Sequence, residues 1–359
     1  MESASISSKL LDRRRLLAQA ATLGVLLVAG RPRLLNAAAA PPPVDLQDIT
    51  ALIQAAIQRH GLDGVSAVAL HHGQTLYRGY FGDIGPATPV PVASASKWVA
   101  GLLVMSFVAE GRLRLDLTLG QAGIAPNGTP AAAITLAQLM SHTSGLPTPS
   151  PRRQDRRYAT SADAARAVPG LDLSGTPGTV FAYGGLSMQV AGFLVEQAGG
   201  ADWNSLFRRR IADPLGLSPA CRWGDKWGVA GGLIATPDDY ERILCMIMAK
   251  GLSPAGRRIL PESAFVAMER NLSASAKRLS LPDAAESLAG YGVGLWCETA
   301  ASDGSCPIIS SPGAFGTYPR IDRPRDLTIL LVVKDRLRRL VDEWRGVITA
   351  LTAVADRQN

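Results

Sequence analysis

Ser94-Ala95-Ser96-Lys97 opens a long apolar stretch, residues 98–107, whose composition predicts a helix. A serine and a lysine three positions apart lie on the same side of a helix, so the amine of Lys97 can reach the hydroxyl of Ser94. A serine hydroxyl attacks poorly until a base takes its proton, and a desolvated lysine can act as that base. Lys97 is the only one of six lysines that has a serine three residues before it. For so short a motif the alternative is a helix cap followed by a surface lysine.

Four further segments indicate which alternative applies. They are LMSHTSGLP at 139–147, PGTVFAY at 177–183, PLGL at 214–217 and GGLIATPDD at 231–239. In order and spacing they resemble the class C β-lactamase-like serine hydrolases, which include D-alanyl-D-alanine carboxypeptidases, family VIII esterases and nylon-oligomer hydrolases. The resemblance runs from about Leu46 to about Val333. It implies a β-lactamase/transpeptidase-like fold and a serine–lysine–tyrosine mechanism without a cofactor.

The resemblance assigns three catalytic roles. Ser94 matches the nucleophile, at a helix N-terminus where free N–H groups favour developing negative charge. Lys97 matches the base or proton relay. Tyr183 matches the tyrosine of the Y-x-N motif, which shares proton transfer to the leaving group; the alternative is a core tyrosine with a satisfied hydroxyl. His142 belongs to a structural loop signature, and we do not expect it to be catalytic.

Two departures from the family pattern bear on the substrate. Gly185 stands where Y-x-N has asparagine, and Ser311 stands where the third motif has lysine or histidine. Gly313 still permits close approach of a substrate backbone, and the N–H groups of Ala314 and Ser94 are the expected oxyanion hole. A cation for a substrate carboxylate is missing at 311, which favours neutral esters and amides over penicillins and D-Ala-D-Ala peptides. Arg320, later on the same expected strand, is the first candidate for a replacement cation.

Hydrophobic periodicity predicts an α+β architecture. We expect a helix at residues 45–60, a hairpin from strands 65–70 and 75–81, and a helical, loop-rich region from 115 to 279. Strands at 291–297, 314–321 and 327–334 and a helix at 336–355 follow. Both chain ends should therefore build one antiparallel sheet flanked by helices, with the mainly helical lobe inserted and the site between the two lobes. Residues 45–355 are expected to be one hydrolase domain.

Composition excludes several classes of function. The net charge is +7, but residues 1–40 hold six basic and two acidic residues, so the remainder is too mildly basic to indicate nucleic-acid binding. The Arg208-Arg209-Arg210 run is expected to be a solvated face. No Cys/His spacing or H-E-x-x-H motif indicates a metal. Cys297 and Cys306 flank a polar turn and are expected to form a disulfide, whereas Cys221 and Cys245 either pair or stay as buried thiols.

The N-terminus resembles an export signal. Arg13-Arg14-Arg15 precedes an uncharged apolar stretch that ends at Gly30, and small residues at 37–40 offer a cleavage site. Residues 1–40 are therefore predicted to be a twin-arginine-like signal peptide that directs the protein to the periplasm or outside the cell. The alternative is an uncleaved signal, which would be the protein's only membrane association.

Other hydrolase designs fit less well. An α/β-hydrolase needs G-x-S-x-G and a late histidine, but the chain has no such motif and its last histidine is His142. We expect a serine hydrolase that acts through an acyl-enzyme on small-molecule esters, amides or peptides, most like a carboxylesterase. A D-alanyl-D-alanine carboxypeptidase or a β-lactamase is the nearest alternative. A non-catalytic penicillin-sensing or binding module is the alternative of a different class.

Overall fold

In the computed structural model, Val44–Asn359 form one compact unit. The structure describes residues 45–148, 158–224, 228–282 and 285–358. The predicted signal peptide, residues 1–40, lies outside the described residues. None of the helices in the described ranges combines the length and the apolar character needed to cross a membrane.

A seven-stranded antiparallel sheet is the frame of the unit, in the order β2-β1-β12-β11-β10-β9-β8. The strand from the start of the chain and the strand near its end are direct neighbours, with Val65 opposite Val333 and His71 opposite Leu327. The prediction that both chain ends build one sheet is therefore confirmed. The strands are β1 (Gly64–His71), β2 (Gln74–Gly82), β8 (Gly290–Tyr291), β9 (Trp296–Thr299), β10 (Ile308–Ser310), β11 (Tyr318–Asp322) and β12 (Leu327–Val333).

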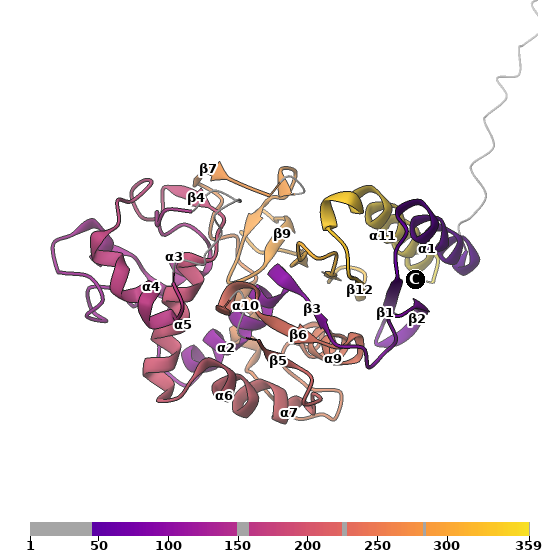
Figure 1. Cartoon of the computed structure of the whole chain (residues 1–359), viewed down its shortest axis with the longest axis horizontal. Helices are drawn as coiled ribbons and strands as arrows, with labels where there is room; N and C mark the ends of the chain where they lie inside the picture. Colours follow the sequence, from indigo (N-terminus) through magenta and orange to yellow (C-terminus); the bar gives the residue numbers. More distant parts are fainter. Residues whose placement is uncertain (1–44, 149–157, 225–227, 283–284, 359) are drawn as a thin grey trace, which may run out of the picture. The chain divides into compact units, whose positions relative to one another are not determined.

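Two helices cover one face of this sheet. Helix α1 (Leu46–His60) begins at a capping box in which Asp45 and Asp48 each accept from the other's backbone N–H. Helix α11 (Val341–Asp356) lies beside it (Figure 1) and buries Trp344 against the sheet. The apolar residues of the two helices and of alternate positions in β1 and β12 form a separate core cluster. Helices α1 and α11 thus depend on each other for burial.

The opposite face belongs to the larger core, which the inserted helical lobe builds. Twelve of the fourteen residues of α2 are buried, so this helix is the centre of the lobe rather than a surface helix. Helix α9 packs against β11 and β12 from the same side. The helices of the lobe are α2 (Ser96–Ala109), α3 (Leu136–Met140), α4 (Ser161–Ala167), α5 (Leu186–Gly199), α6 (Trp203–Phe207), α7 (Asp213–Leu215), α8 (Gly228–Gly231), α9 (Pro237–Met248) and α10 (Glu262–Met268).

Several predicted elements have other boundaries in the structure. The strand predicted at 291–297 is a hairpin, because residues 292–295 form a turn between β8 and β9 with Gly294 at φ 79°. The strand predicted at 314–321 starts only at Tyr318, since residues 314–317 form a turn. Strand β10, with only three residues, was not predicted. The last helix starts at Val341 rather than 336, after a 3-10 turn, η7 (Leu337–Arg339).

Short strands also occur outside the seven-stranded sheet. One set forms a three-stranded sheet, and a second set forms a parallel pair. Each has only two to four residues, too few for the period-two pattern to show in the sequence. They are β3 (Val90–Pro91), β6 (Leu233–Ala235) and β5 (Arg222–Trp223), and the pair β4 (Val180–Ala182) and β7 (Lys277–Ser280).

The predicted disulfide is present. Cys297 in β9 is bonded to Cys306, while Cys221 and Cys245 are free thiols. Burial raises the pKa of the Cys245 thiol to about 11 and raises that of Cys221 further, so both thiols are neutral and unreactive near pH 7.

Candidate active site

Ser94 lies in a one-turn 3-10 helix, η1 (Ala93–Ala95), that runs directly into α2. The turn contains a strained residue, because Ala93 has a φ of 49°. The hydroxyl of Ser96 holds it closed by donating to the carbonyl of Ala93 at 2.6 Å and accepting from the N–H of Leu233 at 3.0 Å. Ser94 is therefore presented by a tightly fixed backbone, and its side chain is partly exposed.

Lys97 is the immediate partner of Ser94. Its ammonium donates to the Ser94 hydroxyl at 3.2 Å and to the carbonyl of Ala230, in α8, at 2.8 Å. The side chain is only 4% exposed. Lys97 is thus held against the serine with little access to bulk water, as the S-x-x-K spacing predicted. Sequence reasoning missed Ala230, since a backbone acceptor carries no side-chain signal.

Tyr183 faces the same amine. The ammonium of Lys97 lies 4.8 Å from the centroid of the Tyr183 ring. The ring is stacked on Trp296 of β9 at 5.1 Å with an interplanar angle of 25°, and its edge meets Tyr291 at 5.9 Å. The backbone N–H of Tyr183 donates to the carbonyl of Ser280 at 3.0 Å. An aromatic wall therefore fixes the tyrosine beside the lysine.

His142 supports this wall from behind. Its ring is fully buried and lies 4.6 Å from the Tyr183 ring and 4.8 Å from the Tyr291 ring, centroid to centroid. Neither ring nitrogen has a hydrogen-bond partner among the described residues. Burial, and then the positive charge of Lys97, hold the pKa of His142 well below its ordinary value, so the ring is neutral. This geometry agrees with a structural rather than an acid–base role.

The segment from Ser311 to Ala314 closes the other side of the nucleophile. The Ser311 hydroxyl donates to the backbone carbonyl of Ser94 at 3.2 Å. A side chain at position 313 would put its Cβ 2.0 Å from the carbonyl oxygen of Val92, so only glycine lets this segment lie so close to the backbone of Val92. Within the described chain, the backbone N–H groups of Ser94 and Ala314 donate no hydrogen bond. Two free donors at this end of the site are what an oxyanion hole requires.

Gly185 occupies the N-cap position of α5, without a side chain that could bind a substrate. Its backbone is buried, in a turn that starts at Tyr183. The carboxamide that an asparagine would contribute here is therefore missing from the site.

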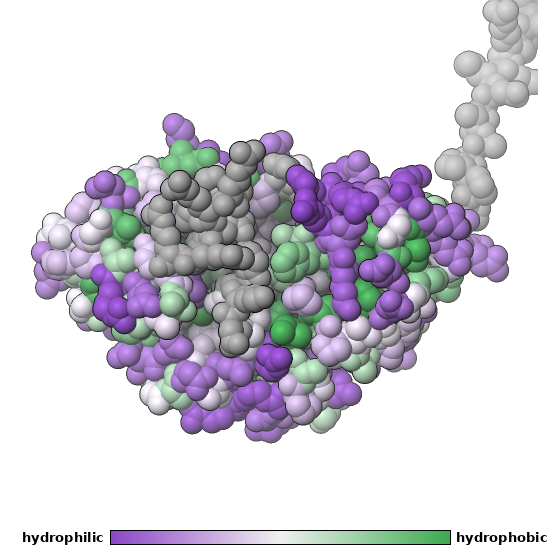
Figure 2. All heavy atoms as spheres, viewed as in Figure 1, coloured by the Kyte–Doolittle hydropathy of each residue, from purple (hydrophilic) through white to green (hydrophobic). Residues whose placement is uncertain are grey.

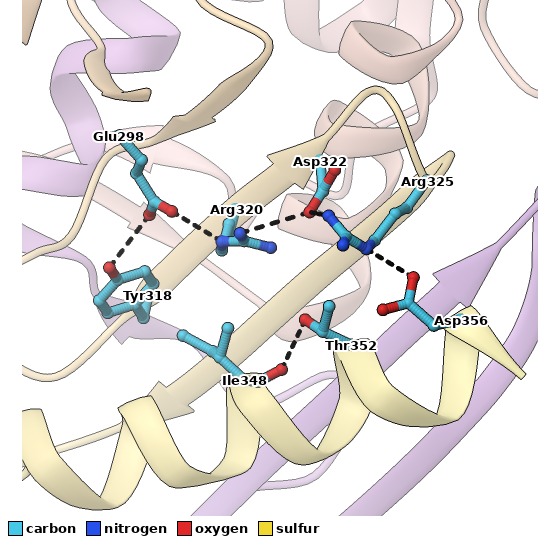
Figure 3. A network of polar contacts seen from close by, with 8 residues as sticks. All are labelled: Glu298, Tyr318, Arg320, Asp322, Arg325, Ile348, Thr352 and Asp356. Carbon is cyan, nitrogen blue, oxygen red and sulfur yellow. Dashed lines mark hydrogen bonds and ion pairs between the residues drawn. The ribbon is translucent and has the colours of Figure 1, made fainter. Parts of the chain in front are cut away.

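Arg320, the expected replacement cation, is committed elsewhere. Its guanidinium donates to Glu298 at 2.8 Å and to Asp322 at 3.4 Å (Figure 3). Tyr318, on the same face of β11, donates to Glu298 and packs on the core cluster shared with α1 and α11. Figure 3 shows Arg320 between its two carboxylates on the side of the sheet that α11 covers. Contrary to the expectation from the sequence, Arg320 is therefore not available to hold a substrate carboxylate.

The described residues contain no group of three or more His, Cys, Asp or Glu side chains placed to hold a metal ion. The chemistry that the site offers is that of a serine with a buried amine, a phenol and two free N–H donors. These groups suit acyl transfer through a covalent intermediate.

Comparisons with known proteins agree with this geometry. The chain is 28% identical to penicillin-binding protein 4 of Amycolatopsis lactamdurans over 216 residues, covering 50% of this chain and 56% of that protein. It is 25% identical to the D-alanyl-D-alanine-carboxypeptidase/endopeptidase AmpH of Escherichia coli over 219 residues, covering 55% and 52% of the two proteins. The alignments thus span about half the length of these relatives.

A solved structure matches over more of the chain. A putative β-lactamase from Bacteroides dorei superposes with a TM-score of 0.78 at 28% identity, covering 87% of this chain and 99% of that one. Residues 49–350 match the family described as Beta-lactamase, which is most of the chain. The chain therefore belongs to the Beta-lactamase family of serine hydrolases.

Proposed function

We propose that the protein hydrolyses small neutral acyl esters or amides through an acyl-enzyme on Ser94. The contact that supports this most directly is the one between the amine of Lys97 and the Ser94 hydroxyl, which are 3.2 Å apart and partly shielded from solvent. A buried amine next to a serine hydroxyl is an arrangement that exchanges protons with a nucleophile.

In the proposed first half-reaction, Lys97 acts in its neutral amine form: the Ser94 oxygen forms a bond to the substrate carbonyl carbon while the hydroxyl proton passes to the Lys97 amine. The carbonyl oxygen becomes an oxyanion, for which the N–H groups of Ser94 and Ala314 are the donors. Tyr183, fixed beside Lys97, relays a proton to the leaving alkoxide or amine as the carbon–heteroatom bond breaks. In the second half-reaction water attacks the acyl-enzyme, gives a proton to the same groups and releases the carboxylic acid and the Ser94 hydroxyl.

The preference for neutral substrates rests on charge. Within the described chain, the side chains that contact Ser94 or Lys97 carry no second positive charge: the Ser311 hydroxyl is neutral, and His142 is held neutral by burial. The ammonium of Lys97 already donates to Ser94 and Ala230. A substrate carboxylate would lose hydration here without a replacement partner, at a cost of about 1–3 kcal/mol, or roughly tenfold to hundredfold in kcat/KM.

The test compares a nitrophenyl butyrate with a chromogenic cephalosporin. We expect faster turnover of the ester, and an acyl adduct visible by intact-mass measurement with a slow substrate. Ser94→Ala should abolish the adduct and lower kcat by more than about a thousandfold, and Lys97→Ala should do nearly the same. Ser66→Ala is the matched control, because it removes a buried serine hydroxyl from β1 in the sheet.

Two results would contradict the proposal at different levels. Full activity in Ser94→Ala or Lys97→Ala would remove the mechanism itself. Faster turnover of the cephalosporin than of the ester would leave the mechanism intact but would contradict the substrate class.

A specific observation favours a carboxylate-bearing peptide or lactam as the second candidate. The turn at Ala314 is bonded to the segment that precedes α11, where the N–H of Leu337 donates to the Ala314 carbonyl at 3.0 Å. Arg336 and Arg338 flank Leu337 and are exposed. If one of them binds a substrate carboxylate, Arg336→Gln or Arg338→Gln will lower kcat/KM for a cephalosporin about tenfold and leave nitrophenyl butyrate unchanged. Equal effects on both substrates would exclude this role.

We also propose that the chain is exported through a twin-arginine pathway, on the evidence of residues 13–30 alone. Replacing Arg13 and Arg14 together by lysine should leave the protein in the cytoplasm, since such signals are read as an address. N-terminal sequencing of the exported protein should start within Ala38–Ala40. Recovery of residues 1–30 on the exported protein would instead support an uncleaved anchor.

A further inference from the structure

A hollow lies at the opposite end of α2 from Ser94. It encloses about 570 Å³, within the range of small-molecule sites. Its walls come from the last turn of α2 with Glu110 and Arg112, from the segment after α6, and from residues 257–261 before α10. Helix α2 has fourteen residues, so the hollow and Ser94 are about 20 Å apart along its axis and form two separate sites.

The lining of this hollow is strongly basic. It includes five arginines and one glutamate, a formal charge of +4; the arginines are Arg112, Arg209, Arg210, Arg257 and Arg258. The single acid is already neutralised, because Arg210 donates to both carboxylate oxygens of Glu110, at 2.6 and 2.5 Å. This pairing holds the pKa of Glu110 below its ordinary value, so it stays ionised as a partner of Arg210.

None of the other four guanidinium groups forms an ion pair with a described residue, although the charges of Arg112 and Arg258 act on Glu110 and Glu262, respectively. Arg112 donates to the carbonyl of Ala198, and Arg258 donates to the carbonyl of Lys250 at 2.6 Å. The side chains of Arg209 and Arg257 make no hydrogen bond or ion pair with the described part of the chain. Arg209 and Arg257 therefore carry positive charge that no described carboxylate neutralises.

Rings and backbone hold these arginines in place. The guanidinium carbon of Arg210 lies 3.9 Å, and that of Arg112 5.3 Å, from the centroid of the Phe107 ring, so one ring orients both. Arg208–Ala212, labelled η5, forms a π-helical turn between α6 and α7. Such turns are rare and often occur at functional sites, because the wider turn redirects the side chains it carries.

A tight hairpin brings the remaining two arginines to the hollow. The N–H of Ser253 donates to the carbonyl of Arg257 at 2.8 Å, and Leu252 and Arg258 form an isolated antiparallel β-bridge. Gly256, at φ 76°, makes this turn possible. Two unrelated backbone features thus direct arginines to one hollow. Figure 2 shows hydrophilic residues gathered along the lower edge of the molecule, over the α6 and α7 of Figure 1.

We propose that this hollow is a binding site for a small, soluble, multivalent oxyanion of the phosphate-ester type. Planar guanidinium groups bind phosphate oxygens in pairs, and Arg209 and Arg257 are free to do so. The apolar residues Leu206, Ile259 and Pro261 line the same hollow and leave room for an organic group attached to the phosphate. The site is independent of Ser94, so Ser94→Ala should bind the anion as the unmodified protein does.

The test is calorimetric titration of the full chain with sodium pyrophosphate at constant ionic strength. We expect saturable binding of one anion per chain. Arg209→Gln and Arg257→Gln should each weaken it by about tenfold or more. Arg345→Gln is the matched control, because it removes one exposed arginine from α11, on the other side of the sheet, and should leave binding unchanged. Arg209 and Arg257 are exposed, so their variants should melt with the unmodified protein.

Three results would overturn the proposal. One is the absence of saturable pyrophosphate binding. Another is equal weakening in Arg345→Gln, which would indicate attraction by net charge alone. The third concerns the source of the phosphate. Binding to phosphatidylglycerol vesicles, but neither to phosphatidylcholine vesicles nor to pyrophosphate, with loss in Arg209→Gln, would assign the surface to a lipid headgroup instead.

Discussion

Removing the disulfide between Cys297 and Cys306 should destabilise the protein by an amount that the loop length sets. The two cysteines are nine positions apart. Closing a loop of this size removes about 8.7 cal/mol/K of entropy from the unfolded chain, which is about 2.6 kcal/mol at 25 °C. For a domain of roughly 300 residues, unfolding entropy near 2.1 cal/mol/K per residue converts this loss into a Tm lowered by about 4 °C. The change is Cys297→Ala with Cys306→Ala.

The assay is thermal unfolding of the double variant beside the unmodified protein, each with and without dithiothreitol. The reduced unmodified protein should melt with the double variant, which should not respond to the reductant. Cys245→Ala, which removes a free thiol, is the control. A thiol count in denaturant should give two groups before reduction and four after it. Four thiols before reduction, or a double variant that melts with the unmodified protein, would refute the reasoning.

Three further changes test the packing around the site. Trp296→Ala should lower stability by about 3–5 kcal/mol and kcat by roughly a hundredfold, because Tyr183 loses its stacked partner. Trp296→Phe should restore most of kcat at unchanged KM. Equal activity in the two variants would contradict the positioning role of Trp296. His142 is buried in its neutral form, so as the pH falls below about 6.5 the histidine is protonated in the unfolded state before it is protonated in the folded state. The free energy of unfolding should therefore fall by up to about 1.4 kcal/mol per pH unit. In urea titrations, the free energy of unfolding of His142→Phe should depend less on pH over this range. Ser66→Ala should raise stability by about 1–3 kcal/mol in the same urea assay, because the Ser66 hydroxyl is buried without a hydrogen-bond partner in the described chain. A loss of stability would show that the hydroxyl has such a partner.

Features fixed by local sequence could be predicted. The helix that starts at Leu46 has its capping aspartate and its apolar spacing in the sequence, and the β1–β2 hairpin shows its alternation and its turn. The contact between Ser94 and Lys97 follows from helical spacing alone. Each of these depends on residues close together in the chain.

Features fixed by distant contacts could not be predicted. The turn at 292–295 exists because Gly294 lies against the backbone of α2: a Cβ there would come within 2.3 Å of the Lys97 carbonyl oxygen. The stacking of Trp296 on Tyr183 joins residues more than a hundred positions apart. The position of Arg320, by contrast, could have been predicted from the alternation of polar residues along its strand. Residues 318, 320 and 322 alternate onto one face of β11, which is the face that α11 covers.

The pairing of β1 with β12 has a consequence for how the protein is made. Residue 65 finds its strand partner at residue 333, so β1 lacks its hydrogen bonds to β12 until nearly the whole described chain has left the ribosome. Before then β1 carries an unpaired strand edge, which is a template for aggregation. Such long-range closure also makes folding slow. Nascent chains arrested before Leu327 should therefore remain open to proteases and bound by chaperones, and release of the segment that contains β12 and α11 should be the step that commits the molecule to its native state.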